Sequence, residues 1–149
     1  MGSFAARYVR VTNLESDIER LQAQGFDDIA VGADGRYAAV RVFEDSYVDT
    51  NGLKKLSTEF GEALFLSADT VTETFRYERW AGGKLVRALT YTADQGWWFD
   101  TGTPEEWEAD LISHAALSDP NTEARDRTGP IAADRLAMEV SGRLGLPPV

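Results

Sequence analysis

The spacing of apolar residues predicts three strands at the start of the chain. Residues 6–11 alternate between polar and apolar side chains, which is typical of a strand. Residues 29–31 and 36–43 flank Asp34-Gly35, a dipeptide that strongly favours a two-residue hairpin turn. With that turn, the aliphatic residues of both strands share one face of the sheet, namely Ile29, Val31, Ala38, Val40 and Val42.

Two amphipathic helices fit between the strands. The first is expected over residues 13–24, where Thr12 and Glu15 fit a capping box and Gly25 with Phe26 fits the helix end. Its inward stripe is formed by Leu14, Ile18 and Leu21. The second helix is expected to begin near Thr50 or Asn51 and to end at Gly61, with Leu53, Leu56 and Phe60 facing inward.

The apolar run 63–66 predicts a buried central strand directly after the second helix. The order of elements up to this point is β-α-β-β-α-β, which is the ferredoxin-like order. We therefore expect the chain to begin with a ferredoxin-like unit.

A long hairpin is predicted in the second half of the chain. Residues 70–80 and 84–93 alternate, and a three-residue loop at residues 81–83 collects the apolar side chains on one face. That face holds Val71, Phe75, Tyr77, Leu85, Leu89 and Tyr91. The opposite face is polar, apart from Trp80 at its tip, and we expect it to be solvated.

The remaining elements complete an α+β fold. Residues 95–100 fit one more strand, and Thr103-Pro104-Glu105-Glu106 is the clearest helix start in the chain. The buried stripe of that helix is expected to be Trp107, Leu111 and Ala115. Residues 119–130 read as a loop or linker before a last helix at 130–144, which ends at Gly145. The residues of this helix expected to face inward are Ala133, Leu136, Ala137, Val140 and Leu144. We expect a single domain over residues 1–149, with an antiparallel-rich sheet and helices largely on one face.

Charge is distributed unevenly along the chain. The net charge is −10, and residues 88–124 contain no lysine or arginine but eight carboxylates. This window therefore carries −8 of the total of −10. An acidic surface argues against nucleic acid and other polyanionic partners, and it favours a basic protein if the segment has a partner. The adjacent pair Lys54-Lys55 is interpreted as part of a solvated helix face.

The residue types offer little catalytic chemistry. The chain has no cysteine, and its only histidine, His114, is interpreted as a helix-surface or half-buried residue. The paired carboxylates fit turns and helix starts, and no calcium loop, nucleophile elbow or phosphate-binding loop is present. We therefore predict no catalytic residue, cofactor or metal site, and whether the protein is an enzyme stays open, with non-enzyme favoured.

Aromatic residues accompany the acidic window. Trp97, Trp98 and Phe99 are consecutive, so in a regular strand the first and third face one way and the second faces the other. Either both sides are core, or one aromatic side chain belongs to a contact surface. After the helix-starting Glu105 and Glu106 are set aside, the candidate partner-binding residues are Asp94, Trp98, Asp100, Glu108 and Asp110.

A sequence pattern in the second half resembles a family of uncharacterised bacterial proteins. It consists of Gly83-Lys84-Leu85, then Arg87, Leu89 and Tyr91, and then Gly102, Pro104, Glu105, Trp107 and Glu108. The end of the chain, Leu144-Gly145-Leu146-Pro147, is also similar. The resemblance implies a shared fold and no particular substrate.

These observations favour a non-catalytic, acidic protein-binding module, such as an inhibitor or immunity-type protein for a basic partner. Two alternatives stay open. One is a small-molecule binder or enzyme with a pocket of Tyr, Trp and carboxylate side chains, and the other is an accessory part of a larger assembly. We expect a cytoplasmic protein without a membrane-spanning segment, because no apolar run is long enough and no signal peptide is evident. The oligomeric state is left open.

Overall fold

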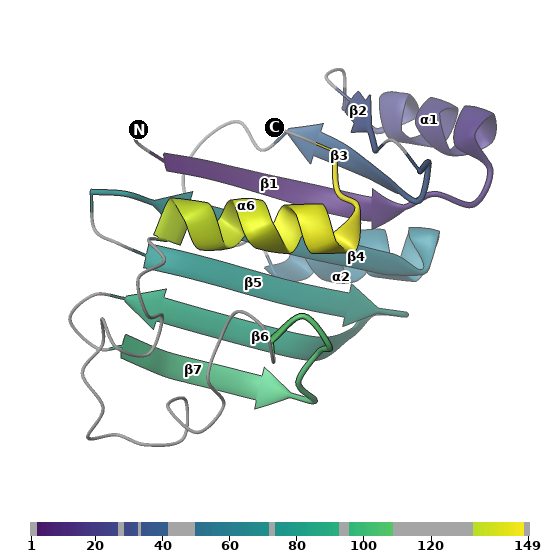
Figure 1. Ribbon diagram of the computed structural model, residues 1–149. Helices are drawn as coiled ribbons and strands as arrows, with labels where there is room; N and C mark the ends of the chain where they lie inside the picture. The colour runs from purple at the N-terminus through teal and green to yellow at the C-terminus, as the bar shows by residue number, and fades with distance from the viewer. Residues whose placement is uncertain are drawn as a thin grey trace.

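One antiparallel sheet organises the part of the chain that the structure describes (Figure 1). The computed structural model describes residues 3–26, 29–32, 34–41, 50–71, 74–92, 96–108 and 133–147. Within these residues seven strands and three helices are defined, so the predicted α+β class is confirmed.

The strands follow one another across the sheet in the order β2-β3-β1-β4-β5-β6-β7, and β4 is the central strand. Every neighbouring pair is antiparallel. The strands are β1 (Ser3–Arg10), β2 (Ile29–Val31), β3 (Tyr37–Arg41), β4 (Glu62–Asp69), β5 (Thr74–Ala81), β6 (Lys84–Thr92) and β7 (Gly96–Gly102). The predicted buried strand at 63–66 is thus the core of β4.

The helices cover both faces of the sheet. α1 (Leu14–Ala23) and α2 (Thr50–Phe60) pack on one face, and α6 (Ala133–Leu144) lies across the other (Figure 1). The prediction of helices largely on one face holds for α1 and α2 but not for α6. The reason is that both faces of β4 are apolar, so each needs a cover.

The first half follows the predicted order of elements. Residues from Ser3 to Asp69 run β-α-β-β-α-β, although the ferredoxin-like assignment itself stays a prediction. The Asp34-Gly35 turn gives the predicted hairpin register, with Ile29 opposite Val40 and Val31 opposite Ala38. α2 begins at Thr50 and ends before Gly61, as its pattern indicates.

α1 ends as predicted but begins differently. The Phe26 N–H donates to the Leu21 carbonyl (3.2 Å) beyond Gly25, whose φ is +96°, which is the expected helix stop. At the start, Asn13 rather than Thr12 is the N-cap, and its side chain accepts from the Ser16 N–H. Leu14 is 51% exposed and leaves the predicted inward stripe.

The β5–β6 hairpin keeps the predicted faces through a different turn. Phe75 lies opposite Tyr91 and Tyr77 opposite Leu89, as expected. The turn has two residues, Gly82 and Gly83, both at positive φ, and not the three predicted. A register shift next to Trp80 adds one residue and restores, from Arg79 and Arg87 onward, the alternation that a two-residue turn alone would have inverted. Leu85 lies opposite Trp80 on the turn side of this shift, so the prediction that it shares the apolar face with Tyr77 and Leu89 is wrong.

The polar face of this hairpin is less solvated than predicted. Glu78 and Thr90 are both buried on it, and the Trp80 indole N–H donates to Glu78 Oε1 (2.9 Å). Val71, by contrast, is strongly exposed and does not join the apolar face. Trp80 and Glu78 therefore shield each other from solvent near the β5–β6 turn.

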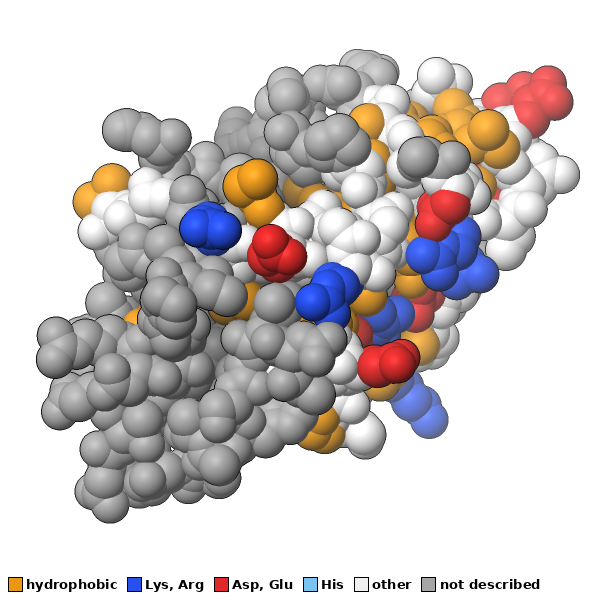
Figure 2. All heavy atoms as spheres, viewed as in Figure 1, with side chains coloured by type: hydrophobic (Ala, Val, Ile, Leu, Met, Phe, Trp, Pro, Cys, Tyr) orange, Lys and Arg blue, Asp and Glu red, His pale blue; other side chains and the backbone are white. Residues whose placement is uncertain are grey.

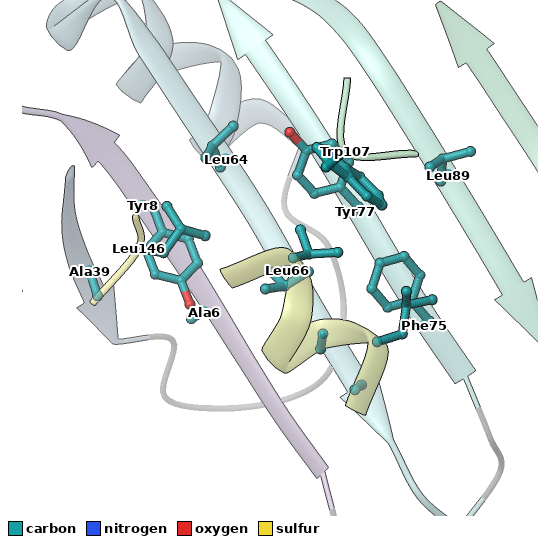
Figure 3. Packing of buried hydrophobic residues seen from close by; sticks show 14 of the residues in the cluster. Ala6, Tyr8, Ala39, Leu64, Leu66, Phe75, Tyr77, Leu89, Trp107 and Leu146 are labelled. Atoms are coloured by element: carbon teal, nitrogen blue, oxygen red, sulfur yellow. The ribbon is translucent and has the colours of Figure 1, made fainter. Parts of the chain in front are cut away.

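Two hydrophobic clusters lie on opposite sides of the sheet. On the side of α6, Tyr8, Leu64, Leu66, Phe75 and Tyr77 pack with Leu136 and Val140 of the helix and with Trp107 (Figure 3). On the other side, Val9, Val40 and Phe65 pack with the inward residues of α1 and α2. Of the predicted inward residues of α6, Leu136, Ala137 and Val140 are buried and Leu144 is partly buried.

Candidate functional site

The carboxylate of Glu105 is held by three side chains on the α6 side of the sheet. The Tyr77 hydroxyl donates to it at 2.7 and 2.8 Å, and Arg79 donates through Nε (2.8 Å) and Nη2 (3.0 Å). The Trp107 indole N–H adds a further bond at 3.0 Å. The Tyr77 and Trp107 rings also meet edge to face, with centroids 5.3 Å apart. Glu105 thus joins β5 to the segment after β7.

Arg79 is shared between two carboxylates. Its Nη1 group donates to Glu62 at the start of β4, and the Tyr37 hydroxyl donates to the same carboxylate. Arg79 Nη1 also lies 3.5 Å from the Tyr37 oxygen. Strands β3, β4 and β5 therefore meet residues 103–108 through one hydrogen-bonded network.

A second ion pair, Arg87–Glu108, is fully buried beside this network. Arg87 Nε donates to Glu108 Oε2 at 2.8 Å, and Arg87 Nη2 donates to Glu108 Oε1. Arg87 Nη1 also reaches the carbonyls of Thr101 (3.3 Å) and Gly102 (3.2 Å). A buried charge is tolerated only when it is paired and hydrogen-bonded in this way.

The two networks follow from the register of the sheet. Arg79 and Arg87 are cross-strand partners on β5 and β6, so two like charges lie directly opposite each other. Glu105 and Glu108 are three residues apart in a turn closed by the Glu108 N–H on the Glu105 carbonyl (3.0 Å). The Glu105 N–H in turn donates to Glu108 Oε2 (2.7 Å). This turn gives each arginine its own carboxylate.

The surroundings fix the protonation of these groups. Burial, followed by the charge of Glu105, raises the pKa of Tyr77, and burial together with Glu62 raises the pKa of Tyr37. Burial works to lower the pKa of Arg79, but the hydrogen bonds and charges of its partners outweigh it and raise that pKa. At neutral pH the tyrosines are therefore neutral donors and Arg79 is a cation.

The predicted partner-binding residues are placed only in part. Asp94 and Asp110 lie outside the described residues, and of Trp98 and Asp100 the backbone is described. Glu108, one of the candidate partner-binding residues, is fully buried, where it neutralises Arg87. The structure brings it together with Glu105, which the sequence assigned to a helix start.

The backbone of β7 departs from regular alternation at Trp98. Trp97 lies opposite Tyr91 and Phe99 opposite Thr90, so Trp98 is an extra residue without a partner on β6. The expectation that Trp97 and Phe99 share a face rested on a regular strand, and the register shift interrupts that alternation. β7 itself, predicted at 95–100, is present at Gly96–Gly102.

The predicted helix after Thr103 starts later than its sequence signal. Residues 103–105 have no regular secondary structure, residues 106–107 form a turn, and the first helical residue is Glu108. Trp107 is buried, as predicted. The remainder of the predicted helix, the predicted loop or linker at 119–130 and His114 lie outside the described residues.

No other chemistry stands out in the described part of the chain. Within it, no three His, Cys, Asp or Glu side chains come close enough together to hold a metal ion. None of its helices is both long and apolar enough to cross a membrane.

Sequence reasoning missed Tyr37, Glu62, Arg79 and Arg87 as members of a common site. A signal for the two arginines was present, because each stands in register with the apolar face of the hairpin that carries Tyr77 and Leu89. A charged residue at such a position needs a buried counter-ion. Which carboxylate supplies it depends on contacts between distant parts of the chain.

Comparison with known proteins places the chain in a family. Residues 3–132 match the model of a family of unknown function (DUF6928). The chain belongs to this family. The matched residues include the whole sheet and both ion-pair networks and end before α6. No curated protein and no solved structure is similar to the chain.

Proposed function

We propose that this member of the family is a non-catalytic module that binds a basic protein through the acidic segment at residues 88–124. The observation that carries the proposal is the charge of that segment, eight carboxylates without one lysine or arginine. Complementary charge at this density chiefly raises the rate at which a basic partner associates. An inhibitor or immunity-type protein in the cytoplasm is the form of such a module that we favour.

The internal ion pairs support this proposal by showing which acids are already neutralised. Arg79 and Arg87, which lie outside the segment, take up Glu105 and Glu108. The other six carboxylates of the segment have no basic residue within it, and Glu106, between the two paired glutamates, is exposed. Elsewhere, on the face shown in Figure 2, acidic and basic side chains of the described residues are interspersed.

The small-molecule alternative receives less support. It needed Tyr, Trp and carboxylate groups that converge and remain available to a ligand. Tyr77, Trp107 and Glu105 do converge, but their polar groups bond to one another. These contacts hold the segment after β7 against the sheet, so we do not propose that the three side chains form a ligand-binding pocket.

A pair of charge reversals tests the proposed function. Immobilised protein is exposed to extract of the native cell at low and at high ionic strength, and retained proteins are identified. We expect a basic protein that is retained at low salt and released at high salt. Glu106→Lys should weaken its retention, whereas Glu139→Lys, the same change at an exposed position of α6, should not. Retention of no basic protein at low salt, or equal effects of the two variants, would contradict the proposal.

A further inference from the structure

The three lysines of the chain lie together around the β5–β6 turn, although they come from separate parts of the sequence. Lys54 and Lys55 lie on α2, and Lys84 is the first residue of β6. The turn before Lys84 packs on α2, because a Cβ at Gly83 would lie 2.6 Å from Thr58 Oγ1 and 3.9 Å from Lys54 Cγ. All three lysines are exposed. We call them the lysine cluster.

Hydrogen bonds hold the two parts of the lysine cluster in place. The Gly83 N–H donates to the Ser57 hydroxyl (2.9 Å), which itself donates to the Lys54 carbonyl (2.9 Å). The Gly82 N–H donates to the carbonyl of Gly61, the residue after α2 (3.1 Å). The fold therefore fixes the backbone of the turn against the backbone of α2, and one ligand is able to meet lysines from both elements.

The lysines differ from their surroundings in having no carboxylate partner. Within the part of the chain that the structure describes, no lysine ammonium group takes part in an ion pair or a hydrogen bond. The one acid of α2, Glu59, is already engaged by Arg20 (3.4 Å) and by the Gln24 side-chain amide (2.7 Å). Three positive charges are thus left uncompensated on a chain whose net charge is −10.

The small size of the lysine cluster limits the kind of anion that fits it. A long nucleic acid or an anionic membrane extends beyond three side chains and meets the strongly negative remainder of the chain. A short run of carboxylates avoids most of this repulsion, because charges more than about 8 Å away are screened at physiological salt. Charge and size together favour a short acidic segment of a protein.

We propose that the lysine cluster binds a short acidic segment of a second protein partner. The inference goes beyond the proposed function, since the lysines belong to a different surface from the acidic segment. α2 covers one face of the sheet, whereas Trp107 of the acidic segment is buried in the hydrophobic cluster on the other face. The protein then has two binding surfaces of opposite charge.

An eight-residue peptide of aspartate tests the inference on the wild-type chain. At low salt the amide chemical shifts of residues 54, 55, 83 and 84 should move on addition of the peptide, and high salt should reverse the change. The lysines carry the only side-chain amines of the chain, so carbodiimide cross-linking of the peptide to a protein side chain should map to them by mass spectrometry. Elsewhere the negative chain should repel the peptide.

Matched neutralisations locate the contact. Lys84→Gln should weaken the peptide about two- to fivefold, as expected for one exposed ion pair, and the triple change of all three lysines to Gln should abolish measurable binding. Arg135→Gln removes the same charge at an exposed position of α6 and should leave the affinity unchanged. Because the four side chains are exposed, the variants should fold like the wild type.

Several results would overturn the inference. These are unchanged shifts at the lysine cluster at low salt, and equal effects of Lys84→Gln and Arg135→Gln. Tighter binding of a duplex of about thirty base pairs or of phosphatidylserine vesicles than of the peptide would assign the cluster to a nucleic acid or to a membrane. Salt-sensitive self-association without peptide would assign it to a second copy of the chain.

The inference and the proposed function fail separately. Retention of a basic protein should be the same for the wild type and the triple lysine variant, because that retention depends on the acidic segment. Loss of the basic protein in the triple variant would show that the two surfaces are not independent and would contradict the inference. If the wild type retains no basic protein, the proposed function fails, and the peptide result still decides the role of the lysine cluster.

Discussion

Single residues decide how the segment after β7 is attached to the sheet. Arg87 lies on a face that is otherwise built from Leu89, Tyr91 and similar side chains, where an unpaired charge would be very costly. Glu108 makes the position tolerable by neutralising the guanidinium and filling two of its donor positions. The pair therefore acts as a specific attachment point, since no other register of residues 103–108 would supply both Glu105 and Glu108.

Removal of one partner of this pair should be far more damaging than removal of both. Glu108→Leu leaves the Arg87 charge buried and uncompensated, so we expect a loss of about 3–5 kcal/mol in the free energy of unfolding. The double variant Arg87→Leu with Glu108→Leu should recover most of that loss, because no charge is left buried. Urea denaturation of both single variants and the double variant measures the coupling. If the double variant lost as much stability as Glu108→Leu alone, or as much as the two single variants together, the pair would not be buried and mutually neutralised.

At the scale of elements, local signals were readable and contacts between distant residues were not. Gly25 and Gly145 end their helices as predicted, because the left-handed stop depends on residues within one turn. The β5–β6 bulge was missed, since both turn lengths are locally acceptable and only the whole sheet selects the result. The partners of Arg79 and Arg87 lie 26 and 21 residues away, beyond the reach of any local pattern.

Asp17 in the first turn of α1 should make the free energy of unfolding depend on pH in the acidic range. Burial works to raise the pKa of Asp17, but the Thr12 and Asn13 N–H groups and Arg20 outweigh it and lower that pKa. The unfolded chain then binds the proton more tightly, so this contribution is present above the usual Asp pKa of about 4 and is lost as pH falls.

A pair of amide substitutions in α1 tests this. Stability measured by denaturation between neutral pH and about pH 3 should fall less steeply in Asp17→Asn than in the wild type. Glu19→Gln, at an exposed position of the same helix, should leave the slope unchanged. Parallel slopes for the wild type and Asp17→Asn would show that the cap does not hold a proton-sensitive bond.

The end of β7 depends on a glycine. Gly102 has φ of +95°, and a Cβ there would lie 1.9 Å from the Val86 carbonyl oxygen. Gly102→Ala should therefore lose at least about 1–2 kcal/mol from the backbone conformation alone. Gly142→Ala, in α6 with no atom near the added methyl group, should gain about 0.5–1 kcal/mol. Thermal unfolding of the two variants should shift in opposite directions, and a shared direction would contradict the close approach.

At the scale of the whole molecule, the ion pairs explain the family-like sequence pattern of the second half. Arg87 near the start of the pattern pairs with Glu108 at its end, and Glu105 and Trp107 bond to each other beside them. Gly102 permits the turn that brings the two parts together. The residues of the pattern therefore attach residues 103–108 to the sheet. The acidic residues of the segment that lie outside the pattern are not needed for this attachment.

The two hydrophobic layers share one sheet, so they should unfold together. Leu136 of α6 is buried on one face, and Leu53 of α2 is buried on the other. Each change to Ala should cost about 2–5 kcal/mol. Since the two residues belong to separate hydrophobic clusters on opposite faces of the sheet, the double variant should lose the sum to within about 0.5 kcal/mol.

The same experiment tests whether residues 1–149 form one cooperative domain. Far-UV circular dichroism and tryptophan fluorescence should report coincident transitions in the wild type and in both variants, because loss of either layer exposes the shared strand β4. Met138→Ala, at an exposed position of α6, serves as the control and should change stability by less than about 0.5 kcal/mol. If Leu136→Ala separated the two transitions, the α6 layer would be an independent unit, and the segment attached on that side, which we propose binds the partner, would fold and unfold without the rest of the sheet.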